Sequence, residues 1–215
     1  MRWPSFRTLA SRYAVAAAFL VLVGIADVVL GALPSHLAAQ VRLWASTNVS
    51  NLHHHPLQAL VFSAFLAEQS RVIWLAVIAL AMFGANRALG NWRFALVCAA
   101  GQIVGTVVSE GIVAYRIDHG LLPASSAHII DIGPSYVVVA AIVVAVMYGS
   151  WPARVVALFD FAGLVFGGHI FAGLSNLDVS AVGHVTSMVT AAVVGYLLSR
   201  RGLAPDRAAR RARAA

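Results

Sequence analysis

Two short polar segments open apolar runs and could together carry nucleophilic chemistry. The first is residues 133–136, Gly-Pro-Ser-Tyr, and the second is the pair Gly183 and His184. A serine hydroxyl becomes a nucleophile when a neighbouring imidazole accepts its proton, so these residue types suit acyl transfer. Ser135 is the candidate catalytic nucleophile and His184 the candidate base. The alternative for each is a structural hydrogen bond between packed membrane helices.

The residues just before Ser135 predict how its backbone is used. Proline is favoured at the start of a helix, so Gly133 and Pro134 indicate a loop that ends and a helix that begins. Ser135 then lies in the first turn, where its N–H has no partner within the helix and is suited to bind an oxyanion. Asp131, one turn earlier, is a possible orienting group for an imidazole; the alternative is a solvated carboxylate at the helix entrance.

The elements that must position these residues are membrane helices. The chain of 215 residues is 60% hydrophobic and 11% charged, with a mean hydropathy of +0.83, which excludes a disordered or ordinary soluble protein. A bilayer core needs about 20 apolar residues per helix. Six runs have about that length, namely Tyr13–Leu33, Ser70–Ala88, Trp92–Tyr115, Ile130–Ser150, Ala153–Leu174 and Val179–Ser199. They predict an all-α membrane protein, a bundle of six transmembrane helices with a long outer first loop.

The arginines predict the orientation of this bundle. All 15 basic residues are Arg, and with a cytoplasmic N-terminus only Arg42, Arg71 and Arg116 lie outside. By the positive-inside rule, this asymmetry places both termini in the cytoplasm, in the inner (plasma) membrane. The basic ends then face lipid headgroups, so the lipid bilayer and not nucleic acid is the expected partner. The expected domains are a basic N-terminus (1–12), a membrane domain (13–199) and a basic tail (200–215).

The predicted topology brings Ser135 and His184 to similar depth. The fourth and sixth runs both cross from outside to inside, and each residue lies near the outer start of its run. The sixth run also carries small residues at intervals of four, Gly183, Ser187, Ala191 and Gly195. Such a stripe lets another helix approach closely.

This order of motifs, Gly133-Pro-Ser135 opening one span and Gly183-His184 opening a later one, resembles the rhomboid intramembrane serine proteases. The resemblance covers residues 13–199. It implies a six-helix core, interfacial helices in the outer first loop, a Ser135–His184 dyad without a cofactor, and transmembrane segments of other proteins as substrates. The lack of Lys beside abundant Ala and Arg suggests a bacterial source.

Some positions differ from the family pattern. Tyr136 stands where the family has glycine after the nucleophile, and the family's tyrosine four residues after that serine falls on Val139. Counting back from residues 84–90 places Ser70 and Trp74 where the family has its His and Asn oxyanion donors. With Gly133, they are the oxyanion or supporting candidates, since both side chains carry a hydrogen to donate. These differences leave open a rhomboid-like pseudoprotease that binds membrane clients without cutting them.

Other chemistries have weaker support. A transporter or channel is disfavoured because the chain has no internal repeat and few charges. The histidines at 53–55, 128 and 169 have no helical pairing with a carboxylate that indicates a metal site, and the single Cys98 offers no disulfide. We therefore expect neither metal nor cofactor. The sequence assigns no role to Glu110, Asp160, His169 or the run His53–His55.

Overall fold

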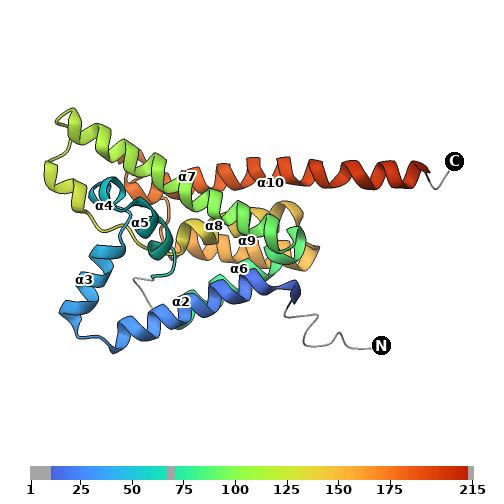
Figure 1. Ribbon diagram of the computed structural model, residues 1–215, viewed down its shortest axis with the longest axis horizontal. Coiled ribbons are helices and arrows are strands. Elements are labelled where there is room, and N and C mark those ends of the chain that lie inside the picture. The colour runs from blue at the N-terminus through green and yellow to red at the C-terminus, as the bar shows by residue number, and fades with distance from the viewer. Residues whose placement is uncertain (1–10, 67–70, 213–215) are drawn as a thin grey trace.

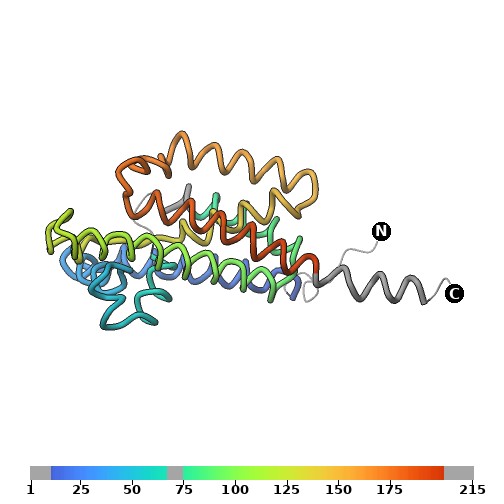
Figure 2. The backbone as a smooth tube through the Cα atoms, turned by 90° about the horizontal axis from the view of Figure 1, so that it is seen from above, coloured from blue at the N-terminus to red at the C-terminus, as the bar shows by residue number. Residues whose placement is uncertain are grey.

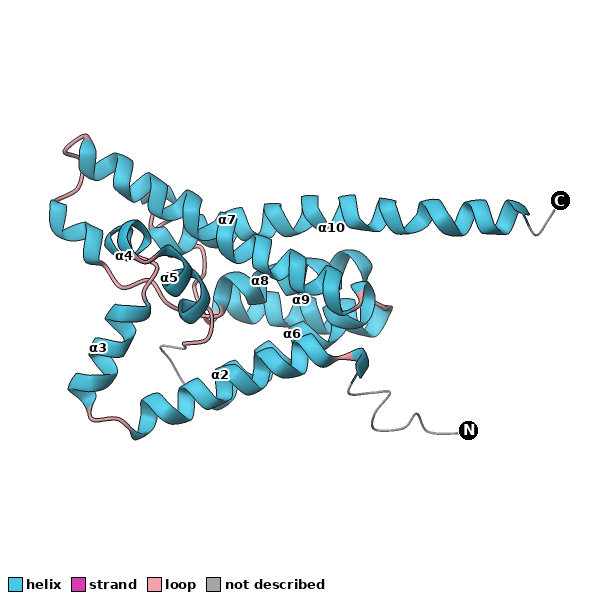
Figure 3. Ribbon diagram, viewed as in Figure 1, coloured by secondary structure: helices cyan, strands magenta, loops and turns pink. Residues whose placement is uncertain are grey.

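The computed structural model describes residues 11–66 and 71–212, and these residues form no strand (Figure 3). Long helices are α2 (Ala14–Ala32), α6 (Arg71–Leu89), α7 (Asn91–Asp118), α8 (Ser135–Tyr148), α9 (Trp151–Phe166) and α10 (Val179–Ala212). Three short helices follow α2, namely α3 (Ser35–Ala45), α4 (Val49–His54) and α5 (Pro56–Ser63). Two 3₁₀ turns, η1 (Ala124–His128) and η2 (Leu174–Asn176), precede α8 and α10. The protein is all-helical, as predicted.

Several of these helices are apolar enough for a bilayer. Within the described residues, three are long enough to cross it, over Ala14–Ala32, Asn91–Asp118 and Val179–Arg200. Shorter apolar helices cover Leu75–Leu89 and Ser135–Tyr148. The chain is therefore a multi-pass membrane protein. Each of the six predicted runs overlaps one long helix, but the count of six spans stays a prediction.

Helix α8 lies at the centre of the bundle. It packs against α6, α7, α9 and α10, and Figure 2 shows it between α7 and α9. Its side chains are buried almost all round, which explains why its sequence is apolar on every face. Its 14 residues span about 21 Å, less than the roughly 30 Å of a bilayer core. The helix that begins with Ser135 is thus enclosed by protein.

The segment before α8 is extended, although the sequence predicts a span from Ile130. The Thr47 N–H donates to the Asp131 carbonyl at 2.9 Å, and the Gly133 N–H donates to the Ser63 carbonyl at 3.0 Å. Gly133 has φ +148°, a backbone conformation that residues other than glycine rarely adopt. These bonds to the first loop replace helical bonds, so α8 begins at Ser135.

Helices α7 and α10 approach each other through small residues. The Ser187 hydroxyl donates to the Gly101 carbonyl at 2.7 Å. A Cβ at Gly105 would collide with the Ser187 hydroxyl oxygen and would lie 3.0 Å from the Gly183 carbonyl oxygen. The small-residue stripe predicted on the sixth run therefore faces α7 at Gly183 and Ser187, and α8 at Gly195.

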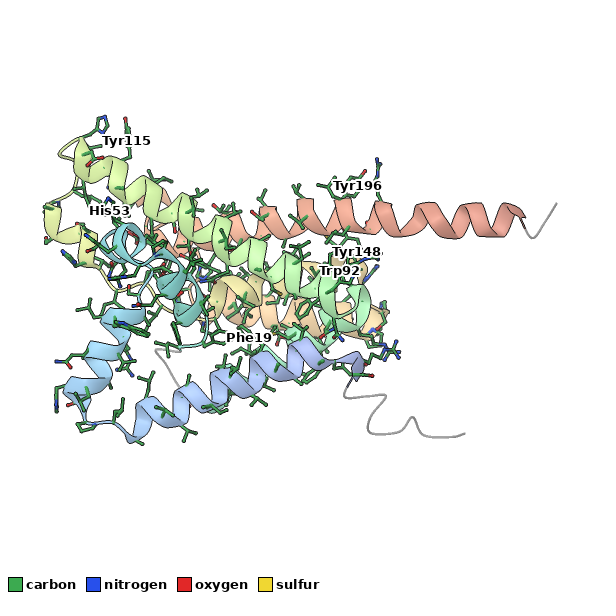
Figure 4. All side chains as sticks on the ribbon, in the orientation of Figure 1. Phe19, His53, Trp92, Tyr115, Tyr148 and Tyr196 are labelled. Atoms are coloured by element: carbon green, nitrogen blue, oxygen red, sulfur yellow. The ribbon has the colours of Figure 1, made fainter. Side chains whose placement is uncertain are left out.

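Aromatic side chains lie at both ends of the bundle. Helix α2 begins and α10 ends at the same end (Figure 1), while α3, α4 and α5 lie toward the other. Trp92, Tyr148 and Tyr196 lie toward the first end, and His53 and Tyr115 toward the second (Figure 4). Amphipathic aromatic rings at both ends suit the two membrane–water interfaces.

Candidate active site

Ser135 is the first residue of α8, where the sequence placed it. Pro134 is the N-cap, with φ −71° and ψ 0°, one position earlier than a proline at the first helical residue. The Pro134 carbonyl accepts the first bond, from the Val138 N–H at 2.9 Å. Among the described residues, no hydrogen bond engages the Ser135 N–H. That amide is available to a ligand, as a free donor at a helix start should be.

His184 lies in the second turn of α10 and is only 5% exposed. Its Nδ1 is 2.9 Å from the Ile170 carbonyl oxygen. A carbonyl can only accept, so Nδ1 carries the hydrogen, and in the neutral ring Nε2 keeps its lone pair. Nε2 is buried and has no hydrogen-bond partner among the described residues. This bond to Ile170 assigns the tautomer that a general base requires.

The Ile170 carbonyl is a functional group that the sequence reasoning missed. Helix α9 ends at Phe166, and the turn that follows contains Gly167, Gly168 and a left-handed His169 with φ 52°. The turn is closed by a bond from the Ile170 N–H to the Leu164 carbonyl at 3.2 Å. The two glycines could have indicated the turn, but a backbone acceptor has no side-chain signature. His169 itself is an exposed turn residue.

Tyr136 packs directly against His184. The two rings meet edge to face, with centroids 5.3 Å apart and an interplanar angle of 86°. A Cβ at Gly183 would collide with the Tyr136 ring, and one at Gly105 would come within 3.4 Å of it. Glycine at these two positions therefore makes room for the tyrosine that follows the serine.

Asp131 reaches His184 through Tyr136. The Tyr136 hydroxyl is 3.2 Å from Asp131 Oδ2 and 3.2 Å from the Val179 carbonyl oxygen, while Nδ1 of His184 is bonded to Ile170. The predicted orienting role of Asp131 is thus not a direct bond to the imidazole. The hydroxyl of Thr47 also lies 3.2 Å from Asp131 Oδ2.

The structure brings the starts of α8 and α10 together without a direct bond between the two candidate catalytic side chains. Tyr136, the neighbour of Ser135, contacts His184. In the described part of the chain, no hydrogen bond joins the Ser135 hydroxyl to the His184 ring. A direct hydrogen bond between the Ser135 hydroxyl and the His184 ring therefore stays a prediction.

Of the three predicted oxyanion or supporting residues, the structure describes the hydrogen bonds of Gly133 alone. The Gly133 N–H is already engaged by the Ser63 carbonyl, so Gly133 supports the backbone and leaves no free donor. Trp74 lies in α6 with its side chain outside the described part, and Ser70 lies outside the described residues altogether. The Ser135 N–H is the donor that the geometry offers.

Of the remaining polar candidates, Glu110 lies close enough to Asp131 and Tyr136 to interact electrostatically with both. Glu110 of α7 is buried near the Val49 N–H, and Asp160 of α9 is buried with Oδ2 unpaired among the described residues. His53, His54 and His55 are exposed at the α4–α5 junction. No group of three or more His, Cys, Asp or Glu suited to a metal occurs within residues 11–66 and 71–212.

Comparison with protein families decides the relationship. The family model described as "Rhomboid-like protein" matches residues 11–203, which is most of the chain. The chain belongs to the rhomboid-like protein family. Comparison with curated proteins and with solved structures finds no match. The rhomboid-like match includes the α8 and α10 segments that carry Ser135 and His184.

Proposed function

We propose that this rhomboid-like protein is an intramembrane serine endopeptidase that cuts transmembrane segments of other membrane proteins. The observation that carries the proposal is the tautomer of His184, which leaves Nε2 unprotonated and without a hydrogen-bond partner in the described structure. Its Nδ1 is bonded to the Ile170 carbonyl, so a buried Nε2 with a lone pair is left unpaired among the described residues. Ser135 begins the helix that packs against it.

The reaction follows from these groups. Nε2 of His184 takes the proton of the Ser135 hydroxyl as the oxygen attacks a peptide carbonyl of the substrate. The protonated ring then gives its proton to the leaving amine as the peptide C–N bond breaks. Water, deprotonated by the same nitrogen, releases the acyl group from Ser135. The Ile170 carbonyl keeps the ring in one orientation throughout.

Negative charge that develops on the attacked carbonyl needs hydrogen-bond donors. The Ser135 N–H at the positive end of α8 supplies one. The side chains of Trp74 and Ser70 are the candidates for a second donor, because sequence counting places them at the family's donor positions. Gly133 contributes by holding the turn before the nucleophile.

The proposed enzyme crosses the membrane six times with both termini cytoplasmic. The start of α2 and the end of α10 lie at one end of the bundle, which suits an even number of spans. In this proposed topology twelve of the 15 arginines are cytoplasmic, and Arg42, Arg71 and Arg116 are the three outside. The serine and histidine then lie near the outer face of the membrane.

A fluorophosphonate probe tests the proposal, because it phosphonylates serines that a base has activated. The purified protein in detergent should be labelled, and Ser135→Ala should abolish the labelling. Ser125→Ala is the matched control, since Ser125 is an exposed serine in η1 far from the base in sequence. Equal labelling of the parent protein and Ser135→Ala would contradict the proposal.

A second candidate function is a pseudoprotease that binds membrane clients. It is favoured by one observation, that the Ser135 hydroxyl makes no hydrogen bond to His184 within the described structure. A protein of this kind would resist the probe and would still retain transmembrane clients in a pull-down. Ser135→Ala would leave that retention unchanged.

A further inference from the structure

The Tyr136 hydroxyl joins three separate parts of the site. It lies 3.2 Å from Asp131 Oδ2, in the extended segment before the nucleophile, and 3.2 Å from the carbonyl oxygen of Val179, the first residue of α10. The ring that carries this hydroxyl lies against His184, five residues further along α10. One side chain therefore links the segment of Ser135 to the helix of His184.

We infer that Asp131 and Tyr136 form a positioning bridge that fixes the start of α8 against the start of α10. The inference rests on the proposed peptidase function and deepens it. Neither residue touches the reacting atoms in this account. Their role is to hold the Ser135 segment and the imidazole in one relative position, which matters because a misplacement of about 1 Å can cost about a hundredfold in rate.

The Asp131 end of the bridge is anchored. The Asp131 N–H donates to the Ser46 hydroxyl at 2.8 Å, and the Thr47 N–H donates to the Asp131 carbonyl at 2.9 Å. The Thr47 hydroxyl is within 3.0 Å of that same carbonyl oxygen. The first loop thus holds the Asp131 backbone on both sides of the Cα atom. This fixes the position from which the Asp131 carboxylate directs Oδ2 toward Tyr136.

At the other end of the bridge, the neighbouring helices fit closely around the Tyr136 ring. Tyr136 is buried, and Cβ atoms added at Gly105 of α7 or at Gly183 of α10 would meet its ring. A ring held on two sides in this way cannot swing aside while its hydroxyl is bonded. A phenylalanine would fill the same space but lose the hydroxyl contacts to Asp131, Val179 and Ser109.

The test measures how fast fluorophosphonate labels Ser135, per folded molecule, over a range of probe concentrations. Tyr136→Phe and Asp131→Ala should each lower the maximal labelling rate by about tenfold to a hundredfold and leave the half-saturating probe concentration unchanged. Asp131→Asn keeps an oxygen that can accept from the tyrosine hydroxyl, so it should restore much of the rate lost in Asp131→Ala.

Two controls separate a bridge from general loss of structure. Combined with Tyr136→Phe, Asp131→Ala should slow labelling no further, within about twofold, because the bond is already absent. Ser199→Ala removes a hydroxyl of α10 that donates to the Tyr196 carbonyl of the same helix, far from the bridge, so it should label at the parent rate. Thermal unfolding of each variant gives the folded fraction used to normalise the rates.

The outcomes are distinguishable. Parent rates in Tyr136→Phe and Asp131→Ala, or full multiplication of their effects in the double variant, would overturn the bridge while leaving the peptidase proposal intact. A rate loss that disappears on normalisation to folded protein would overturn it as well. If Asp131→Ala does not fold, the comparison of Tyr136→Phe with Ser199→Ala decides the question. A parent protein that is never labelled at Ser135 refutes the peptidase function and, with it, the bridge.

Discussion

The orientation of His184 is determined by a backbone group instead of a carboxylate. A neutral carbonyl fixes the tautomer through one hydrogen bond, as the aspartate does in a catalytic triad, but it adds no negative charge beside the ring. Asp131 is linked to the ring through the Tyr136 hydroxyl. At the residue scale, the site is a serine, a histidine, the Ile170 carbonyl and a tyrosine that braces the ring.

The tautomer of His184 can be measured directly. In protein labelled with ¹⁵N-histidine, at a pH where the ring is neutral, the ¹⁵N chemical shifts should report a protonated Nδ1 and an unprotonated Nε2. The bond to the Ile170 carbonyl is the reason. The signal is assigned by its loss in His184→Gln, and a neutral ring protonated at Nε2 would contradict the geometry.

The fit between Gly183 and Tyr136 makes a second prediction at this scale. Gly183→Ala places a methyl group against the Tyr136 ring, so it should destabilise the protein by about 1–3 kcal/mol through overpacking and should slow labelling of Ser135. Unfolding in detergent, followed by circular dichroism, measures the stability.

Gly163→Ala is the matched control for that substitution. Gly163 is a helical glycine of α9, and its added Cβ would have no atom within 4 Å. It should leave stability unchanged or raise it by up to about 1 kcal/mol. Equal destabilisation by the two substitutions would contradict the packing argument.

The sequence predicted part of this site, for reasons that differ between residues. Gly133 and Pro134 predict where α8 starts because a proline's fixed φ and missing N–H act locally. The contact between Tyr136 and His184 joins residues 48 positions apart, and it depends on the missing Cβ at Gly183. The sequence interpretation treated Tyr136 as a departure from the family pattern, because no local rule predicts which ring a distant glycine accommodates.

At the scale of elements, hydrophobic run length predicted where helices occur better than where they end. Helix α7 matches its predicted run closely, whereas α8 begins at Ser135 instead of Ile130, and α9 ends at Phe166 instead of near Leu174. Residues before α8 and after α9 are apolar enough to continue a run. Their backbone groups are bonded to Thr47, Ser63 and Leu164, which are contacts that an apolar pattern does not encode.

One polar residue ties three elements together at the end opposite the site. Asn86 of α6 is fully buried; its Oδ1 accepts from the Ala16 N–H of α2 at 3.0 Å, and its Nδ2 donates to Asn91 Oδ1 of α7 at 2.9 Å. It therefore satisfies a free donor in the first turn of α2. Its side chain links α2 to the α6–α7 turn.

Asn86→Ala should lower the free energy of unfolding by about 1–3 kcal/mol, because it leaves buried backbone and side-chain groups unpaired. Chemical denaturation in mixed micelles measures the change. Arg87→Ala, at the exposed neighbouring position, should stay within about 0.5 kcal/mol of the parent. If Asn86→Ala is as stable as Arg87→Ala, the hydrogen bonds of the buried Asn86 side chain contribute nothing to the free energy of unfolding.

At the scale of the whole molecule, the candidate site lies at one end of the bundle, and α2 begins and α10 ends at the other (Figure 1). Helix α10 runs without interruption from Val179 to Ala212, so the base and the basic tail are on one continuous helix. In the proposed six-span topology, α3, α4 and α5 lie on the outer side, around the segment that precedes Ser135.

Cysteine accessibility tests that topology. A cysteine at the exposed position His53 should react with a membrane-impermeant maleimide in intact cells, whereas one placed after Gly202 should react only after the membrane is opened. The native Cys98 is buried, so its background should be low. Labelling of both positions from the same side would contradict six spans.

The central claim is that His184 activates Ser135. Tandem mass spectrometry of the fluorophosphonate-treated protein tests it most directly, because it identifies the modified residue, and His184→Asn run in parallel shows whether the base is needed. We expect an adduct on Ser135 in the parent protein and its loss in folded His184→Asn. An adduct on another serine, no adduct at all, or undiminished modification of Ser135 in His184→Asn would contradict it.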